Sequence, residues 1–154
     1  MKRITSIAGC VALLTLVMFD GCGRHELTDP NELPTFPVTG KVMVDGKPVA
    51  MIRVVAHDTA EPPRPFNEPK GFTKEDGSFL LTTFREGDGV PAGEYKLTFQ
   101  YGTLAMVMGR QYQGDKFKGK YMKKEESKFK LTVTEGQPTD LGTIELTSAA
   151  GKSK

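Results

Sequence analysis

The chain has 154 residues, which suits one domain and leaves no room for a second of ordinary size. Its 21 basic and 19 acidic residues leave a net charge of only +2, so the charge balance gives no electrostatic reason to expect nucleic-acid binding. The chain has 2 histidines, 2 cysteines and no tryptophan, and therefore few of the side chains that build zinc sites or cofactor cages. We expect neither a resident metal nor a cofactor.

The first 21 residues have the layout of a secretory signal peptide. Lys2 and Arg3 supply positive charge, and residues 4–19 form a nearly uninterrupted apolar run that is short for a membrane span. Gly21 stands directly before Cys22 at the end of this run, an arrangement that is typical of a bacterial lipobox. We predict that cleavage removes residues 1–21 and that Cys22 is acylated, which would anchor the exported protein to a bacterial membrane, facing the periplasm or the cell surface.

Two features keep other assignments open. Asp20 occupies the position where a lipobox has a small apolar residue, and the sequence from Ile7 to Cys10 fits the local pattern better. Acylation of Cys10 would leave a very short apolar core in the signal peptide and an apolar tail on the product. Secretion with cleavage nearby, and an uncleaved anchor, are the remaining alternatives.

Behind the signal peptide we expect a tether, one domain and a short tail. Residues 22–35 contain two prolines and mixed charges with little apolar periodicity, which favours a flexible tether. In residues 36–147 apolar and polar residues alternate in short runs separated by turn residues, which predicts an all-β fold, a seven-stranded antiparallel sandwich of the immunoglobulin type. Residues 148–154 are small and basic and are expected to fray.

The first part of the domain shows this alternation clearly. Residues 38–44 and 52–56 each carry an apolar residue at every second position, and the turn Asp45-Gly46-Lys47-Pro48 lies between them. His57 would face outward. Residues 58–69 contain four prolines, so we expect this loop to cross between the sheets or to wrap an edge.

Further strands are predicted along the rest of the domain. Residues 71–74 and 78–84 are joined at Asp76-Gly77, a dipeptide that favours tight hairpins. Residues 95–99, 129–133 and 144–146 again alternate, with the apolar side chains facing inward. Residues 103–108 are compatible with either a short helix or an additional strand.

Three segments of the sequence together resemble the carboxypeptidase regulatory-like domain, a transthyretin-like seven-stranded sandwich found in many bacterial surface lipoproteins. They are VTGKVMVDGKPVAMIRV (38–54), FTKEDGSFLLTTF (72–84) and PAGEYKLTF (91–99). The resemblance implies a fold more than an activity, because members that accompany peptidases are non-catalytic accessory modules. The matching positions are Gly40, Asp45, Gly46, Pro48, Val49, Thr73, Asp76, Gly77, Phe79, Pro91, Gly93 and Tyr95. Each also has a structural explanation, such as a turn glycine or a tyrosine whose hydroxyl bonds to the backbone.

Catalysis and calcium binding both find little support. His25 lies in the tether and His57 on an outer strand face, so neither is placed to activate a nucleophile, and we expect no enzymatic activity. The carboxy-terminal IELTSAAGKSK also lacks the Tyr-Arg-Gly-Ser motif of the transthyretin-related hydroxyisourate hydrolases.

Turn carboxylates could supply oxygen ligands for calcium, but alternating strand direction would divide them between opposite ends of the sandwich. These carboxylates are Asp45, Glu75, Asp76, Glu86 and Asp88.

Residues 110–128 (RQYQGDKFKGKYMKKEESK) are the most distinctive part of the domain. They combine aromatic side chains with lysines, which together can bind anionic polymers or glycans. The alternative is that the aromatics cover a sandwich edge while the lysines stay solvated. If any surface binds a partner, either an envelope protein or an anionic glycan, we predict this one, at the end of the domain opposite the tether. Its candidate residues are Tyr112, Lys116, Phe117, Lys118, Lys120 and Tyr121.

The sequence as a whole therefore predicts a lipid-anchored, non-catalytic β-sandwich of the bacterial cell envelope that has a structural or binding role. A transthyretin-type carrier of small ligands is the alternative, and it would require a channel between subunits. A small hydrolase is the third hypothesis. The sequence leaves the oligomeric state open.

Overall fold

The computed structural model describes residues 32–106 and 110–148. The predictions for the signal peptide, Cys10, Cys22, His25 and residues 149–154 lie outside this part of the chain. Within it the fold is all-β, and no helix is present. Accordingly, these residues include no helix that is long and apolar enough to cross a membrane.

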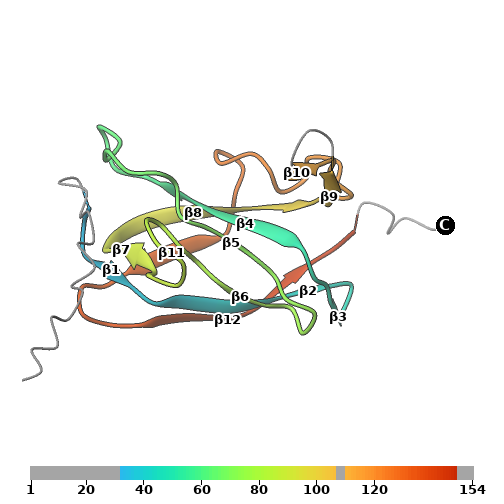
Figure 1. The fold of residues 1–154 in the computed structure, drawn as a ribbon, viewed down its shortest axis with the longest axis horizontal. Coiled ribbons are helices and arrows are strands. Elements are labelled where there is room, and N and C mark those ends of the chain that lie inside the picture. Colours follow the sequence, from blue (N-terminus) through green and yellow to red (C-terminus); the bar gives the residue numbers. More distant parts are fainter. Residues whose placement is uncertain (1–31, 107–109, 149–154) are drawn as a thin grey trace, which may run out of the picture.

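Two sheets lie face to face and enclose the core, as expected for a β-sandwich (Figure 1). In spatial order, one sheet contains β11 (Lys130–Val133), β8 (Gly93–Tyr101), β4 (Ile52–Asp58) and β5 (Lys70–Phe72). The other contains β12 (Thr139–Leu146), β2 (Val38–Val44) and β3 (Lys47–Pro48), with β6 (Ser78–Leu80) also paired to β2. Two small pairs complete the fold, β1 (Thr35–Phe36) with β7 (Val90–Pro91), and β9 (Thr103–Met106) with β10 (Arg110–Gln113).

The predicted alternation of buried and exposed residues is confirmed in the strands that form the core. The apolar residues of β2, β4 and β8 that were expected to face inward are at most 7% exposed, and those of β11 and β12 at most 8%. Burial of such side chains contributes roughly 1.5–3 kcal/mol each, so this alternation is the main source of stability. The buried residues of these five strands are Val38, Val42, Val44, Ile52, Val54, Ala56, Tyr95, Leu97, Phe99, Leu131, Val133, Ile144 and Leu146.

The first predicted turn also forms. Asp45 and Gly46 have φ angles of 50° and 75°, and they connect β2 to β3 as an antiparallel pair. Positive φ at both central residues is the geometry that matches the right-handed twist of a hairpin. Asp tolerates this conformation better than most residues with a side chain, and Gly adopts it freely.

One part of the antiparallel prediction is wrong. The first long strand and the last, β2 and β12, pair in parallel, with Thr139 opposite Val38 and Leu146 opposite Val44. Alternation within a strand reports which face is buried but carries no information about the direction of its neighbour. The register shifts between Asp140 and Thr143, where Gly142 has φ of 61°, so a bulge interrupts the ladder near its start.

Between β4 and β8, the structure excludes one of the two courses that were expected for the proline-rich loop. The proline-rich loop connects β4 to β5, its antiparallel neighbour in the same sheet, and therefore does not cross between sheets. The chain passes from one sheet to the other one turn later, because β5 pairs with β4 while β6 pairs with β2. Asp76-Gly77 thus turns the chain from one sheet to the other. A bridge between Lys70 and Thr82 then links the two sheets along this edge.

Residues 103–106 adopt the strand alternative. They form β9, which pairs with β10 in register from Thr103 opposite Gln113 to Met106 opposite Arg110. This hairpin extends the excursion between β8 and β11, the stretch of chain to which the sequence assigned the partner surface.

Candidate functional site

The lysine segment, residues 115–128, runs along the open edge of β8. Strand β11 pairs only with residues 93–96 of β8, so the remaining edge needs other partners. The lysine segment supplies them, because the Lys116 N–H donates to Tyr101 O (2.7 Å) and the Phe99 N–H donates to Tyr121 O (2.9 Å). The segment thus replaces an edge strand, and its backbone is fixed by the sheet.

The carboxylate of Asp115 shapes the start of the lysine segment. Its two oxygens accept hydrogen bonds from the backbone N–H groups of Tyr101 (2.9 Å), Phe117 (3.0 Å) and Gly119 (2.7 Å). Lys118, between the last two, has φ of 55°. A short acidic side chain that caps several amides in this way holds a tight turn and directs Phe117 inward.

Phe117, a candidate for the partner surface, lies in the hydrophobic core, which agrees with the alternative that the aromatics cover a sandwich edge. Its side chain is 1% exposed and packs against Tyr101 (ring centroids 5.7 Å apart) and, edge to face, against Tyr121 (5.1 Å, 90°). The run Lys116-Phe117-Lys118 is a period-2 pattern, and that signal for an inward-facing ring was available in the sequence.

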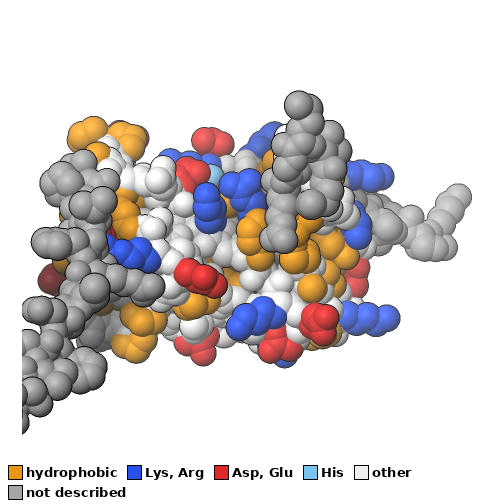
Figure 2. Space-filling model, in the orientation of Figure 1, with side chains coloured by type: hydrophobic (Ala, Val, Ile, Leu, Met, Phe, Trp, Pro, Cys, Tyr) orange, Lys and Arg blue, Asp and Glu red, His pale blue; other side chains and the backbone are white. Residues whose placement is uncertain are grey.

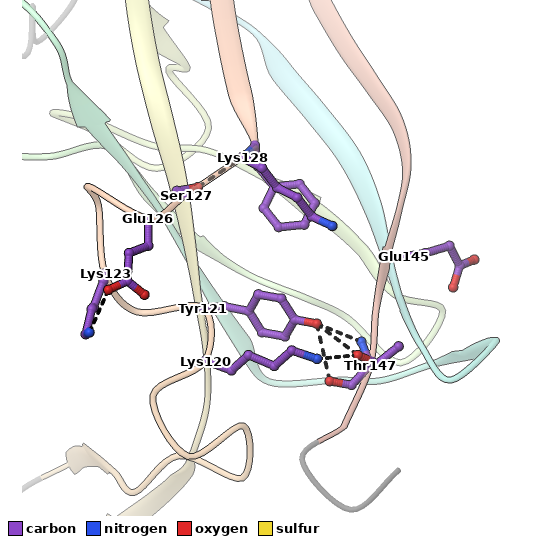
Figure 3. Close-up of a pocket in the computed structure, with 9 residues that line it drawn as sticks. Lys120, Tyr121, Lys123, Glu126, Ser127, Lys128, Glu145 and Thr147 are labelled. Carbon is purple, nitrogen blue, oxygen red and sulfur yellow. Dashed lines mark hydrogen bonds and ion pairs between the residues drawn. The ribbon is translucent and has the colours of Figure 1, made fainter. Parts of the chain in front are cut away.

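Tyr121 joins the lysine segment to the end of β12. Its hydroxyl accepts from the Thr147 N–H (3.0 Å) and lies 3.3 Å from Thr147 O, as Figure 3 shows. Burial alone would raise the pKa of Tyr121, but hydrogen bonds with Thr147 and the nearby ammonium of Lys120 outweigh it, so this pKa is lower than usual. The ring of Tyr121 is partly buried among the core aromatics, and only part of it remains available to a ligand.

Tyr112 serves a structural contact in a different place. Its hydroxyl accepts from the Gly102 N–H (2.6 Å) and bonds to the carbonyl of Met51 (2.5 Å), while its ring edge packs on Phe72 (5.2 Å). Burial is the main reason that the pKa of Tyr112 is raised. The residue ties β10 to the body of the domain.

Most lysines of the segment, by contrast, carry a positive charge that no nearby carboxylate neutralises. The side chains of Lys116, Lys118, Lys120 and Lys128 are exposed. Within the described ranges, none of their ammonium groups lies within 4.0 Å of a carboxylate, whereas Lys123 pairs with Glu126 at 2.7 Å. Lys116 lies over the ring of Tyr101 (4.1 Å), and Lys120 over Tyr121 (5.0 Å). Cation–π contacts of this kind position an ammonium without neutralising it.

A hollow of about 260 Å³ lies between the lysine segment and the end of β12 (Figure 3). Lys120 and Tyr121 border one side of it and Lys128 another, while Glu145 of β12 and Thr147, directly after β12, lie opposite; Phe129 also lines it. In Figure 2 several of the basic side chains in view lie at the right-hand end of the molecule, towards which β12 runs. Since β12 is parallel to β2, this end is opposite the start of β2, as the sequence predicted for the lysine segment.

Two of the turn carboxylates that were considered as calcium ligands, Asp76 and Asp88, cap their own turns. Asp76 accepts from the backbone N–H (3.0 Å) and hydroxyl (2.7 Å) of Ser78, and Asp88 accepts from three consecutive backbone N–H groups beginning at Thr83. Asp45 faces the N–H of Ser148 (3.3 Å). Residues 32–106 and 110–148 contain no group of three or more His, Cys, Asp or Glu side chains that could hold a metal ion.

His57 is less exposed than its outward position suggested. Its Nδ1 lies 2.6 Å from a carboxylate oxygen of Glu68, and its Nε2 lies 2.8 Å from the hydroxyl of Thr98. The proline-rich loop folds back over the outer face of the sheet and brings Glu68 there. Thr98, also expected to face solvent, is consequently only 5% exposed.

The same loop supplies Arg64 to a polar cluster where β4 ends and β8 begins. Arg64 bonds to both carboxylate oxygens of Asp58 (2.6 and 3.0 Å) and to the hydroxyl of Tyr95 (2.9 Å). Burial would raise the pKa of Asp58, but the hydrogen bonds from Arg64 and from the Ala60 N–H outweigh it, so this pKa is lower than usual. The Tyr95 hydroxyl donates to Pro91 O (2.7 Å), the backbone contact that the sequence suggested for this residue.

Comparison with known proteins gives no family for this chain. No family model matches it, and no curated protein matches it. Among solved structures, the chain is similar to a 9R-lipoxygenase from Cyanothece PCC8801, with 17% sequence identity and a TM-score of 0.40 over 78% of this chain. The matched region is 17% of the lipoxygenase chain, and a likeness this weak carries no argument about activity.

Proposed function

We propose that the protein is a non-catalytic binding module of the bacterial cell envelope. In this proposal residues 1–21 direct export, an acyl group on Cys22 holds the protein at a membrane, and the β-sandwich presents the lysine segment to a partner. The layout of the first 22 residues supports export and acylation. The resemblance of residues 38–99 to the carboxypeptidase regulatory-like domain supports a seven-stranded, transthyretin-like assignment and a non-catalytic role.

One observation carries the binding function, namely that the lysine segment combines a fixed backbone with free positive charge. Phe117 in the core and the hydrogen bonds of Asp115 hold the segment, so a partner would not have to order it. The ammonium groups of Lys116, Lys118 and Lys120 are exposed and positioned at one end of the domain. A fixed array of cations favours an anionic partner and speeds its association.

The direction of the chain supports the same function. The tether would enter at the start of β2, and the lysine segment lies at the other end of that strand, beside Thr147. A seven-residue strand spans about 20 Å at the usual rise per residue. The lysines would therefore point away from the membrane that holds the tether.

The binding proposal is tested with two triple variants that remove the same charge. Lys116, Lys118 and Lys120 are changed to Ala in the first, and Lys47, Lys70 and Lys74, which are exposed outside the lysine segment, in the second. We expect the first variant to bind purified envelope polysaccharide and acidic peptides at least about tenfold more weakly than wild type, with strong salt dependence, because the array is lost. Equal binding by the two variants would contradict the proposal.

The anchor is tested by labelling cells with radioactive palmitate and measuring the intact mass of the product. Wild type and Cys10→Ala should incorporate label and lose the first 21 residues, whereas Cys22→Ala should incorporate none. Label retained by Cys22→Ala would refute the assignment and transfer it to Cys10.

A further inference from the structure

Strand β12 leaves part of its backbone unpaired beside the lysine segment. The carbonyl of Leu146 accepts a hydrogen bond from the Asp45 N–H (3.0 Å), so the backbone groups of Leu146 face β2. In a parallel pair the N–H and C=O of one residue point the same way, and those of the next residue point the opposite way. Ile144 therefore also faces β2, while Thr143, Glu145 and Thr147 direct their backbone groups outward.

Tyr121 already occupies the first of these outward positions. Its hydroxyl bonds to both the N–H (3.0 Å) and the C=O (3.3 Å) of Thr147, which a neighbouring strand would otherwise do. Glu145 and Thr143 have no corresponding backbone partner among the described residues. The unpaired backbone groups therefore begin at Glu145, next to the groups of Thr147 that Tyr121 occupies, and Glu145 borders the hollow shown in Figure 3.

The charges around this edge favour acidic side chains. Lys120 lies on one side of the hollow and Lys128 on another, and neither has a carboxylate within 4.0 Å in the described structure. Lys128 also lies over the ring of Phe129 (5.5 Å), which keeps its ammonium near the opening. Glu145 is exposed on the strand itself, but its negative charge is smaller than the combined positive charge of Lys120 and Lys128.

We propose that the edge of β12 accepts an extended, acidic peptide segment of a partner protein as an additional strand. The peptide backbone bonds to the free N–H and C=O groups of Thr143 and Glu145, and its carboxylates approach Lys120 and Lys128. This inference rests on the proposed binding function and specifies a protein partner. A glycan would use the lysines, but only a peptide presents alternating donors and acceptors at the two-residue repeat of a strand.

The bulge in β12 limits how far such a strand can extend. The register of β12 shifts between Asp140 and Thr143, where Gly142 has φ of 61°, and Tyr121 closes the other end at Thr147. The usable edge is therefore short. A short edge discourages indefinite strand stacking between copies of the protein, so the charges of the lysines determine which partner binds.

The test uses the purified full-length chain and a fluorescent peptide of four Glu-Val repeats, whose carboxylates share one face when the peptide is extended. A second peptide has the same sequence with every amide N-methylated, which keeps the charge and removes the donors. We expect the N-methylated peptide to bind at least about tenfold more weakly in fluorescence anisotropy, because strand pairing needs those donors. Polygalacturonate is the glycan probe and should compete poorly.

A pair of protein variants examines the same contact from the other side. Glu145→Pro removes the outward N–H, and Glu145→Val removes the same carboxylate but keeps that N–H. The Pro variant should bind the Glu-Val peptide at least about fivefold more weakly than the Val variant, with circular dichroism confirming that both are folded. Should Glu145→Pro fail to fold, the N-methylated peptide still decides the question.

The outcomes separate this inference from the proposed function. Equal binding of the two peptides, combined with loss of binding in the Lys116, Lys118 and Lys120 triple variant, overturns strand addition and leaves the binding function standing. Tighter binding of polygalacturonate than of the Glu-Val peptide overturns the assignment to a protein partner. Failure of every anionic probe to bind overturns both proposals.

Discussion

Without the ring of Phe117, the protein should unfold at a much lower denaturant concentration than wild type. The side chain is 1% exposed and contacts the rings of Tyr101 and Tyr121 at centroid distances of 5.7 and 5.1 Å. Phe→Ala at a packed site costs about 3–5 kcal/mol, because transfer energy is lost and a cavity remains. With a urea slope of about 2 kcal/mol per molar, Phe117→Ala should lower the unfolding midpoint by roughly 1.5–2.5 M.

The matched control is Leu104→Ala, since Leu104 is 50% exposed in β9 and should change stability by no more than about 0.5 kcal/mol. Both midpoints are measured by circular dichroism in urea, on protein that is folded before titration. Because Phe117 holds the lysine segment against the core, hydrogen exchange should also accelerate at the Phe99 amide, which bonds to Tyr121 O. A loss below about 1 kcal/mol for Phe117→Ala would show that the ring is not buried as described and that the lysine segment is not fixed by it.

Two further predictions concern the turn of Gly77 and the burial of Tyr95. Gly77 has φ of +80° and an added Cβ would meet Val42 O at 2.4 Å, whereas Gly46 has φ of +75° and open space around it. Gly77→Ala should therefore cost at least about 1 kcal/mol more than Gly46→Ala in urea unfolding, and equal costs would refute the crowding. Burial raises the pKa of Tyr95 from 10.0 to about 12, so its neutral form is favoured by folding. The free energy of unfolding should then decrease as pH rises from about 10 to about 12, and Tyr95→Phe should make that decrease smaller; a wild-type phenolate absorbance titration with every tyrosine near 10 would contradict it.

The sequence predicted which residues form the core because alternation is a local property. Ile52, Val54 and Ala56 alternate with polar or less buried residues over a single strand, and all three are fully buried. The turn at Asp45-Gly46 could be predicted for the same reason, since only a few residue types tolerate positive φ at both positions. The fold class and the core residues can thus be predicted from residues that are close together in the sequence.

Strand pairing and the environment of the candidate site depend on residues far apart in the sequence, and these were predicted less well. The parallel pairing of β12 with β2 joins Thr139 to Val38, and nothing in either strand encodes it. His57 appeared solvent-facing because Glu68 reaches it only after the proline-rich loop folds back. Phe117 was a candidate for the partner surface because it lies among lysines, although Asp115 turns the backbone so that the ring enters the core. The lysines were assigned correctly to the surface because their charge requires it.

The parallel arrangement of β2 and β12 has a mechanical consequence. If the amino-terminal side is held at a membrane and a partner pulls at the far end of β12, the two strands are drawn in opposite directions along their length. The hydrogen bonds of Ile144 and Leu146 with β2 and the turn after it then share the load in shear and must rupture together, whereas a hairpin pulled at its open end breaks bond by bond. We expect a higher rupture force when single molecules are stretched between Val38 and Leu146 than when they are stretched between Ile52 and Tyr101, which are paired across the end of β4 and β8.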